Sequence, residues 1–282
     1  MHLFVDNLTN VDFSFLDPQR GLLGETWLAN VELDGALDEQ GMVCDFGVVK
    51  KTLRHWLDDE LDHRLAVPVR SPNLVISEDA DYISLSWSYG LPGERAETLT
   101  CRAPRQAIAL VDTDLITPES TAQWCISQLM PQFPSSLQRL NLSFGLETIE
   151  GSAYQYSHGL KKHAGNCQRI AHGHRSRIEI WENGQRSEAM EADWAERWRD
   201  IYIGSEADVV GSDDRHLGFA YRAEQGDFDL NMPRGNCYLI DSDTTVELLA
   251  MHIAQTLKAE HPNSDIDVRA YEGIGKGAQI KA

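Results

Sequence analysis

Three histidines and a cysteine lie close together along the segments "SAYQYSHGL" (152–160) and "NCQRIAHGHRSRIEIWENG" (166–184). His172 and His174 flank one glycine at the start of an alternating apolar run, which predicts a strand with both imidazoles on one face. If a hairpin brings His158 beside them, three imidazoles can bind one metal ion and leave a fourth position open, as in catalytic zinc sites. Histidines on a surface or in a core are the plain alternative, because a His-x-His pair alone is a weak signal.

Cys167 precedes the histidine pair in a loop that is rich in positive charge. Cationic neighbours and a nearby metal ion lower the pKa of a thiol and favour the reactive thiolate, whereas the alternative is an ordinary loop cysteine. A reactive cysteine needs a partner, and the segment "LDDELDHRL" (57–65) offers the adjacent Asp62 and His63. A carboxylate beside an imidazole orients the ring and raises its basicity, although a solvated helix end would show the same residues.

The chain repeats one order of elements, and the three histidines and the cysteine fall in its second copy. Each copy reads as two strands, a helix after an aspartate cap, a variable hairpin region, a second helix and a final strand. The clearest echoes are between residues 41–57 and 189–203, and between residues 109–130 and 238–257. The final strands carry Glu147 and Glu272. We therefore expect two α+β units, residues 1–150 and residues 151–282.

Charge, apolar patterning and cysteine usage exclude several classes of function. The 282 residues carry a formal net charge of −19 that no basic stripe offsets, so we expect no binding to nucleic acid or to anionic membranes. The N-terminal "MHLFVDNLTN" lacks the features of a signal peptide, and no apolar run reaches the roughly 18 residues that a membrane helix needs. Five scattered cysteines make no disulfide framework, so the expected compartment is a reducing cytoplasm.

The order of these motifs resembles the 6-pyruvoyltetrahydropterin synthase family, which includes the bacterial 6-carboxytetrahydropterin synthases of queuosine biosynthesis. The resemblance is carried by the glutamate of the last strand together with "GMVCDFGVVK", "LDHRL", "SAYQYSHGL" and "NCQRIAHGHRSRIEI". It implies the T-fold, an antiparallel β-sheet with two helices on one face. It also implies a homo-oligomer, since T-fold units pack edge to edge into a barrel and so cover their exposed sheet edges. Residues 68–108 and 205–237 lie outside the resemblance.

The resemblance also implies a site and a reaction. The cofactor it implies is Zn²⁺, and the substrate is a small-molecule pterin triphosphate. The family's bacterial members convert 7,8-dihydroneopterin triphosphate to 6-carboxytetrahydropterin and release triphosphate and acetaldehyde. Carried over to this sequence, the zinc ligands are His158, His172 and His174, the catalytic thiol is Cys167, the pterin anchor is Glu272, and the pair that assists the thiol is Asp62 and His63.

The first half departs from this pattern. Leu23 and Glu25 stand where the second half has its histidine pair, and Asp12 or a neighbour stands near the first ligand, so we expect no zinc in this half. The second half has no adjacent Asp-His pair, although His216 follows two aspartates closely. We infer that the halves are complementary and share a composite site, with Glu147 as a relic or as the anchor of a silent pocket.

Three alternatives stay open. A related lyase could use the same site on a different pterin, as in the pyruvoyl route or a side-chain cleavage. A non-catalytic pterin-binding protein is the second alternative, because one half is degenerate, and a zinc hydrolase on an unrelated α+β fold is the third. Binding of a triphosphate by so acidic a protein needs local cations, and the candidates are Lys161, Lys162, Arg175 and Arg177.

Overall fold

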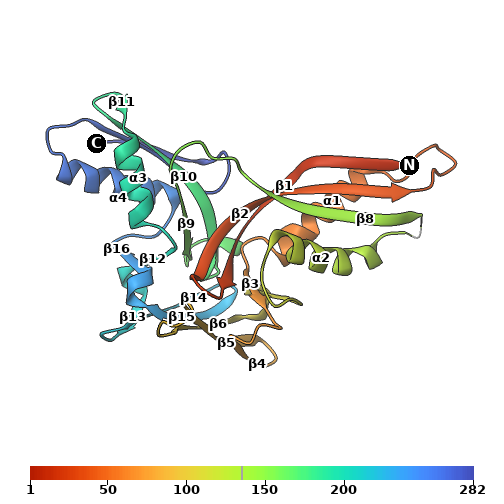
Figure 1. The fold of residues 1–282 in the computed structure, drawn as a ribbon, viewed down its shortest axis with the longest axis horizontal. Coiled ribbons are helices and arrows are strands. Elements are labelled where there is room, and N and C mark those ends of the chain that lie inside the picture. The colour runs from red at the N-terminus through yellow and green to blue at the C-terminus, as the bar shows by residue number, and fades with distance from the viewer. Residues whose placement is uncertain (135) are drawn as a thin grey trace.

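The first half of the chain forms one sheet that two helices cover on one side. The computed structural model describes residues 1–134 and 136–282. The strands of this sheet are, in spatial order, β7 (Ile108–Val111), β3 (Leu65–Pro68), β1 (His2–Asp17), β2 (Gly21–Gly35) and β8 (Leu137–Leu146). β1, β2 and β8 are antiparallel, while β3 and β7 run parallel to β1. Figure 1 shows both helices along the same side of these strands, α1 (Phe46–Glu60) and α2 (Pro118–Leu129).

The side-chain spacing of α1 explains why this helix lies on the sheet. Asp45 caps the helix, because its carboxylate accepts hydrogen bonds from the backbone N–H groups of the two residues after Phe46. Val49, Leu53 and Leu57 recur every four residues and therefore share one face, which is buried in a core with β1, β2 and α2. Burial of each such side chain contributes about 1.5–3 kcal/mol to stability.

The second half repeats this arrangement. Its strands are, in spatial order, β16 (Cys237–Ile240), β12 (Ile201–Ser205), β9 (Ala153–His158), β10 (His172–Glu182), β17 (Ile266–Tyr271) and β18 (Gly277–Lys281), with β11 (Gln185–Arg186) paired to β10. Here too the central strands are antiparallel, and β12 and β16 run parallel to β9. The helices α3 (Glu188–Arg197) and α4 (Val246–Glu260) enclose a core in which Trp194 and Trp198 are fully buried.

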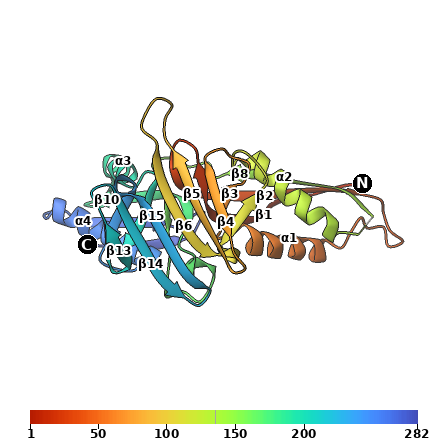
Figure 2. The ribbon, with the colours of Figure 1, turned by 90° about the horizontal axis from the view of Figure 1, so that it is seen from below.

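The two hairpin regions between the helices of each half combine into a third sheet. Its strands are, in spatial order, β13 (Val209–Ser212), β14 (His216–Ala223), β15 (Gly226–Pro233), β6 (Glu97–Pro104), β5 (Tyr82–Tyr89) and β4 (Leu74–Glu78). The halves meet at the antiparallel β15–β6 pair, where Leu230 lies opposite Cys101. Figure 2 views this sheet face on, with strands of both halves side by side. One core cluster contains side chains of both hairpin regions and of β1 and β2.

Short 3-10 helices complete the fold: η1 (Arg105–Ala107), η2 (Met130–Gln132), η3 (Asn166–Gln168), η4 (Glu206–Asp208) and η5 (Arg234–Asn236). Within the residues that the structure describes, we find no helix with the length and apolar character needed to cross a bilayer.

The β1–β2 hairpin also packs on the β9–β10 hairpin with the two backbones in contact. A Cβ atom on Gly24 would lie 1.8 Å from the carbonyl oxygen of Tyr156, and one on Gly173 would lie 2.6 Å from the Cα atom of Gly24. Only glycine allows this approach, since a Cβ atom would overlap the facing backbone. Beside the glycines, the Ser14 and Ser157 hydroxyl groups are 2.7 Å apart and share a hydrogen bond.

The predicted fold class, α+β with two tandem T-fold units, is confirmed by this architecture and by the family match reported below. The structure adds two features to the expectation. Each sheet is extended by short parallel strands, so neither is purely antiparallel. The regions around residues 71–101 and 205–237, for which the sequence gives no function, join the two halves.

Candidate functional site

His158, His172 and His174 meet where β9 ends and β10 begins. The antiparallel register pairs His158 directly with His172, and His174 follows two residues later on the same strand. Ligand nitrogens of all three lie within 4.8 Å of one another, and all three side chains are fully buried. The hairpin expected from the sequence is therefore present, and it brings the three imidazoles together.

These imidazoles are in a chemical state that suits a metal ion. The Nδ1 atoms of His158 and His172 each lie within 3.0 Å of a backbone carbonyl oxygen, which leaves Nε2 free. The Nε2 atoms of all three have no hydrogen-bond partner within the described part of the chain, although they are buried. Burial and the neighbouring imidazoles lower the pKa values of His158 and His172 well below the ordinary value of histidine. Both rings are therefore neutral, which is the form of imidazole that binds metals. The three residues fit a zinc ion with an open fourth position.

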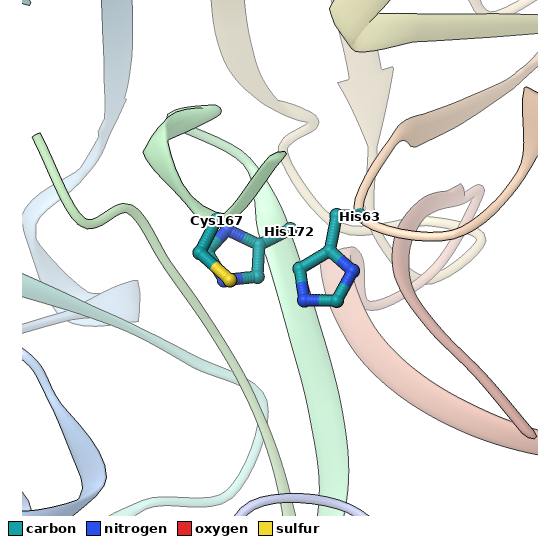
Figure 3. A group of neighbouring side chains, drawn as sticks. All are labelled: His63, Cys167 and His172. Atoms are coloured by element: carbon teal, nitrogen blue, oxygen red, sulfur yellow. The ribbon is translucent and has the colours of Figure 1, made fainter. Parts of the chain in front are cut away.

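Cys167 lies beside this group in η3, the turn that precedes β10. Its Sγ atom lies within 4.8 Å of ligand nitrogens of His63 and His172. Figure 3 shows the ring of His63 facing Cys167 and His172 from a different part of the chain. His63 belongs to the turn between α1 and β3, where its φ of 56° lies in the left-handed region. The structure thus places the first-half histidine next to the second-half thiol.

Asp62 holds His63 in this position. One carboxylate oxygen of Asp62 is hydrogen-bonded to Nδ1 of His63, and the other accepts the backbone N–H of Asp12 at 2.8 Å. Burial disfavours a charged imidazole, but hydrogen bonds to Asp62 and Cys167 and the charges of both groups outweigh it and raise the pKa of His63 to about 10. The protonated ring of His63 places a positive charge within 4.8 Å of the sulfur atom of Cys167.

Glu272 lies at the other side of the histidine group, directly after β17. Its Oε1 atom lies 3.7 Å from Nε2 of His174, and its Oε2 atom lies 3.9 Å from Nζ of Lys276. The side chain is one-fifth exposed, so a ligand can reach this carboxylate. Its position next to Nε2 of His174 allows one bound molecule to reach both the carboxylate and the histidine group.

The four cations that the sequence suggests for a triphosphate already have acidic or carbonyl partners. Lys161 and Lys162 form ion pairs with aspartates of the second half. Arg175 donates to the carbonyl oxygen of Glu147 at 2.9 Å, and Arg177 lies 3.7 Å from the carboxylate of Glu147. A triphosphate at these residues therefore competes with contacts within the chain.

His216 lies away from the thiol. His216 is the first residue of β14 in the third sheet, and its Nε2 atom lies 3.2 Å from the backbone carbonyl oxygen of Thr98. The pair that the structure brings to Cys167 is Asp62 and His63, and not a group around His216.

The counterpart of the histidine group in the first half has no comparable ligands. The β1–β2 register pairs Phe15 with Leu23 as the β9–β10 register pairs His158 with His172. Phe15, and not Asp12, therefore takes the place of the first ligand, which corrects the alignment expected from the sequence. The observed position lies three residues after Asp12, because β1 carries no motif from which the sequence could fix the register.

Polar residues of this counterpart are bound to one another. Glu25 occupies the place of His174, and its carboxylate accepts a hydrogen bond from the side chain of Gln155 at 3.0 Å. Asp200 precedes β12 as His63 precedes β3, with a similar φ of 58°, and its carboxylate is bound by Arg20. Asp200 therefore cannot play in the first-half counterpart the part that His63 has beside Cys167.

Asp12 is a site residue whose position the sequence does not reveal. Its side chain is 2% exposed, and its Oδ1 atom lies 3.2 Å from Nδ1 of His174. Its Oδ2 atom lies 3.2 Å from Nζ of Lys276. Although burial opposes it, the neighbouring His174 and Lys276 and the Thr26 hydroxyl group hold the pKa of Asp12 below its ordinary value. The sequence feature that could have singled out Asp12 is a charged residue within the apolar strand segment "NVDFSF".

Comparison with known proteins agrees with both halves of this description. The profile of the family described as 6-pyruvoyl tetrahydropterin synthase matches residues 12–148 and again residues 147–282. A curated relative, the putative 6-carboxy-5,6,7,8-tetrahydropterin synthase of Pyrococcus horikoshii, is 24% identical over 119 residues. This match covers 42% of the chain and 64% of the relative, which is less than two thirds of its length.

Two solved structures match part of the chain. The 6-pyruvoyl tetrahydropterin synthase of Plasmodium vivax has a TM-score of 0.42 and 17% identity, with 53% of this chain and 93% of that one covered. The Plasmodium falciparum enzyme has a TM-score of 0.41 and 15% identity, with coverages of 51% and 90%. The two profile matches together span nearly the whole chain, and the chain therefore belongs to the 6-pyruvoyl tetrahydropterin synthase family.

Proposed function

We propose that the protein is a zinc-dependent 6-carboxytetrahydropterin synthase, a lyase that acts on 7,8-dihydroneopterin triphosphate and releases triphosphate and acetaldehyde. The observation that supports this most strongly is the convergence of two groups. Three buried imidazoles with free Nε2 atoms lie next to a thiol that faces the Asp62–His63 pair. The product would enter queuosine biosynthesis, and the free state of all five cysteines suits a reducing cytoplasm.

Each residue of the site has its own part in this reaction. His158, His172 and His174 would hold a zinc ion, which would supply Lewis-acid chemistry for acidifying the carbon atom next to the substrate's side-chain oxygens. Cys167, as a thiolate, takes the proton from that carbon. His63 stabilises the thiolate by its positive charge and is itself oriented by Asp62.

Glu272 fixes the pterin ring. Two parallel N–H groups on the amino-pyrimidine edge can donate to its two carboxylate oxygens, which sets the distance between the ring and the thiol. The same carboxylate lies beside Nε2 of His174, so a ring bound here holds its side chain next to the histidine group. We also expect a homo-oligomer, because β8 and β18 each have a strand partner on one side only in the sheets described here.

Two other functions use the same residues. A 6-pyruvoyltetrahydropterin synthase type of lyase would start from the same proton transfer and differ in the later bond-breaking steps. A non-catalytic pterin-binding protein would keep Glu272 and the zinc but need no thiol. The thiol's contact with His63, a residue from the other half, favours an enzyme, since a binding protein has no use for that contact.

The test is turnover of 7,8-dihydroneopterin triphosphate by zinc-loaded protein, with the products identified by mass spectrometry. We expect 6-carboxytetrahydropterin and acetaldehyde from the wild type, and no product from Cys167→Ala despite unchanged zinc content. Cys237→Ala, at a free cysteine in β16 of the second half's sheet, is the matched control and is expected to keep full activity. A pyruvoyl product would support the related lyase. Stoichiometric zinc with no consumption of pterin would contradict an enzyme of either kind.

A further inference from the structure

We propose that Asp12, contributed by the half without metal ligands, is a positioning residue that ties the metal site to the thiol's partner pair and to the pterin anchor. The proposal rests on the proposed zinc site. It concerns a side chain that touches neither the substrate nor the metal, and that acts through the residues it holds.

The side chain of Asp12 contacts both His174 and the segment that bears Glu272. Its Oδ1 atom lies 3.2 Å from Nδ1 of His174, at ion-pair distance but outside the angles of a regular hydrogen bond. The Thr26 hydroxyl group donates to the same oxygen at 2.6 Å and fixes the carboxylate. The Oδ2 atom lies 3.2 Å from Nζ of Lys276, which also faces Glu272.

The turn after Glu272 packs directly on this carboxylate. A Cβ atom on Gly273 would lie 2.4 Å from Oδ1 of Asp12, so the glycine is required for the turn to approach so closely. With φ at +67°, this residue also has the left-handed backbone that glycine adopts without strain. The position of Glu272 is therefore coupled to Asp12 through both Lys276 and Gly273.

The backbone of Asp12 holds the pair beside the thiol. Its N–H donates to Oδ1 of Asp62 at 2.8 Å, and its carbonyl oxygen accepts the N–H of His63 at 2.6 Å. These two bonds anchor the left-handed turn in which His63 lies. One residue of β1 thus contacts His174, the Asp-His pair, and the turn and lysine next to the pterin anchor.

A carboxylate at Nδ1 of a metal-ligating histidine has a known physical effect. It fixes the tautomer with the proton on Nδ1, so that Nε2 presents its lone pair to the metal, and it makes that lone pair more basic. His158 and His172 obtain this orientation from backbone carbonyl oxygens. Nδ1 of His174 instead faces the carboxylate of Asp12 at 3.2 Å, so the proposed orientation of this ring depends on the first half.

The test measures zinc affinity by competition with a chromophoric chelator, without reference to activity. We expect Asp12→Ala to weaken zinc binding about 10- to 100-fold, the usual effect of losing such a partner. Asp12→Asn keeps an acceptor near Nδ1 but loses the charge, and is expected to lie between Asp12→Ala and the wild type. In the cobalt-loaded protein, both substitutions should shift the visible absorption bands of the metal.

Glu25→Gln is the matched control. It removes another buried carboxylate, which occupies the place of His174 in the first-half counterpart and accepts a hydrogen bond from the side chain of Gln155. We expect its zinc affinity and cobalt spectrum to equal those of the wild type, with thermal unfolding used to show that all variants are folded at the assay temperature.

Three results would overturn the proposal, and they can be told apart. If both Asp12 variants bind zinc as tightly as the wild type, Asp12 does not position His174 and the proposed zinc site still stands. If Glu25→Gln weakens binding as much as Asp12→Ala, the loss reflects general destabilisation. If the wild type binds no zinc, the proposed function fails as well.

Discussion

At the scale of single residues, Glu25 stands in the first half at the position that His174 has in the second, and this difference affects charge as well as metal binding. Glu25 is 7% exposed, and burial raises its pKa to about 7, against the partial compensation of the Thr26 backbone N–H, Arg175 and Arg20. The folded protein therefore binds a proton at Glu25 more tightly than the unfolded chain does. Its contribution to stability is greatest below pH 4.5 and falls as the pH rises from 4.5 to about 7.

This gives a prediction for Glu25→Gln. The glutamine cannot ionise, so the variant escapes the loss of stability that ionisation of Glu25 causes. Relative to the wild type, its free energy of unfolding should improve between pH 4.5 and pH 8, by an amount on the order of 3 kcal/mol. Urea unfolding of both proteins at several pH values measures this change. A difference between them that stays constant with pH would contradict the burial of an ionisable Glu25.

Where a motif repeats a known spacing, the sequence names residues that lie close together in the fold. His158, His172, His174 and Cys167 meet where β10 begins, with Glu272 beside His174, and their roles stay predictions. Asp12 was not assigned to this point, because its contact with His174 depends on how two hairpins cross, and neither hairpin determines that crossing by itself.

At the scale of elements, the crossing of the β1–β2 and β9–β10 hairpins is what builds the site. It brings Asp12 to His174, and it depends on the backbone contact between Gly24 and Gly173. Both glycines are next to site positions, since Gly173 separates His172 from His174. A small change at the crossing therefore moves His172 and His174 relative to the first half.

We predict that Gly24→Ala destabilises the protein and weakens metal binding, although Gly24 lies in the half without ligands. The new methyl group would overlap the carbonyl oxygen of Tyr156, and overpacking of this kind costs about 1–3 kcal/mol or more. Denaturant unfolding and zinc competition measure the two effects. Gly145→Ala is the control, because its Cβ atom on β8 would be 3.8 Å from the nearest atom and should cost little. Equal behaviour of the two variants would argue against the crossing as a structural requirement.

The sequence predicted the order of the main strands and helices, because their apolar periods and the cap at Asp45 are local signals. It did not predict the short parallel strand β3, which has four residues and is too short to show a period. The third sheet was also missed, since the partner of β6 is β15 and lies in the other half of the chain.

At the scale of the whole molecule, the two T-fold units form one structure rather than two independent domains. They share the third sheet, the core cluster beneath it and the hairpin crossing. Within the described residues, the three clustered histidines and the thiol come from the second half, and the Asp-His pair comes from the first. We therefore predict one complete site per chain, formed by that chain alone.

The most direct test of this claim is complementation between two inactive variants. His63→Ala and Cys167→Ala are co-expressed, and the rate of 7,8-dihydroneopterin triphosphate consumption is compared with that of wild type co-expressed with the double variant. Because each chain builds its own site, the two single variants should stay inactive together, while the wild-type mixture keeps the activity of its intact chains. Recovery of activity in the mixture of single variants would contradict the claim, since it would require His63 of one chain to serve Cys167 of another.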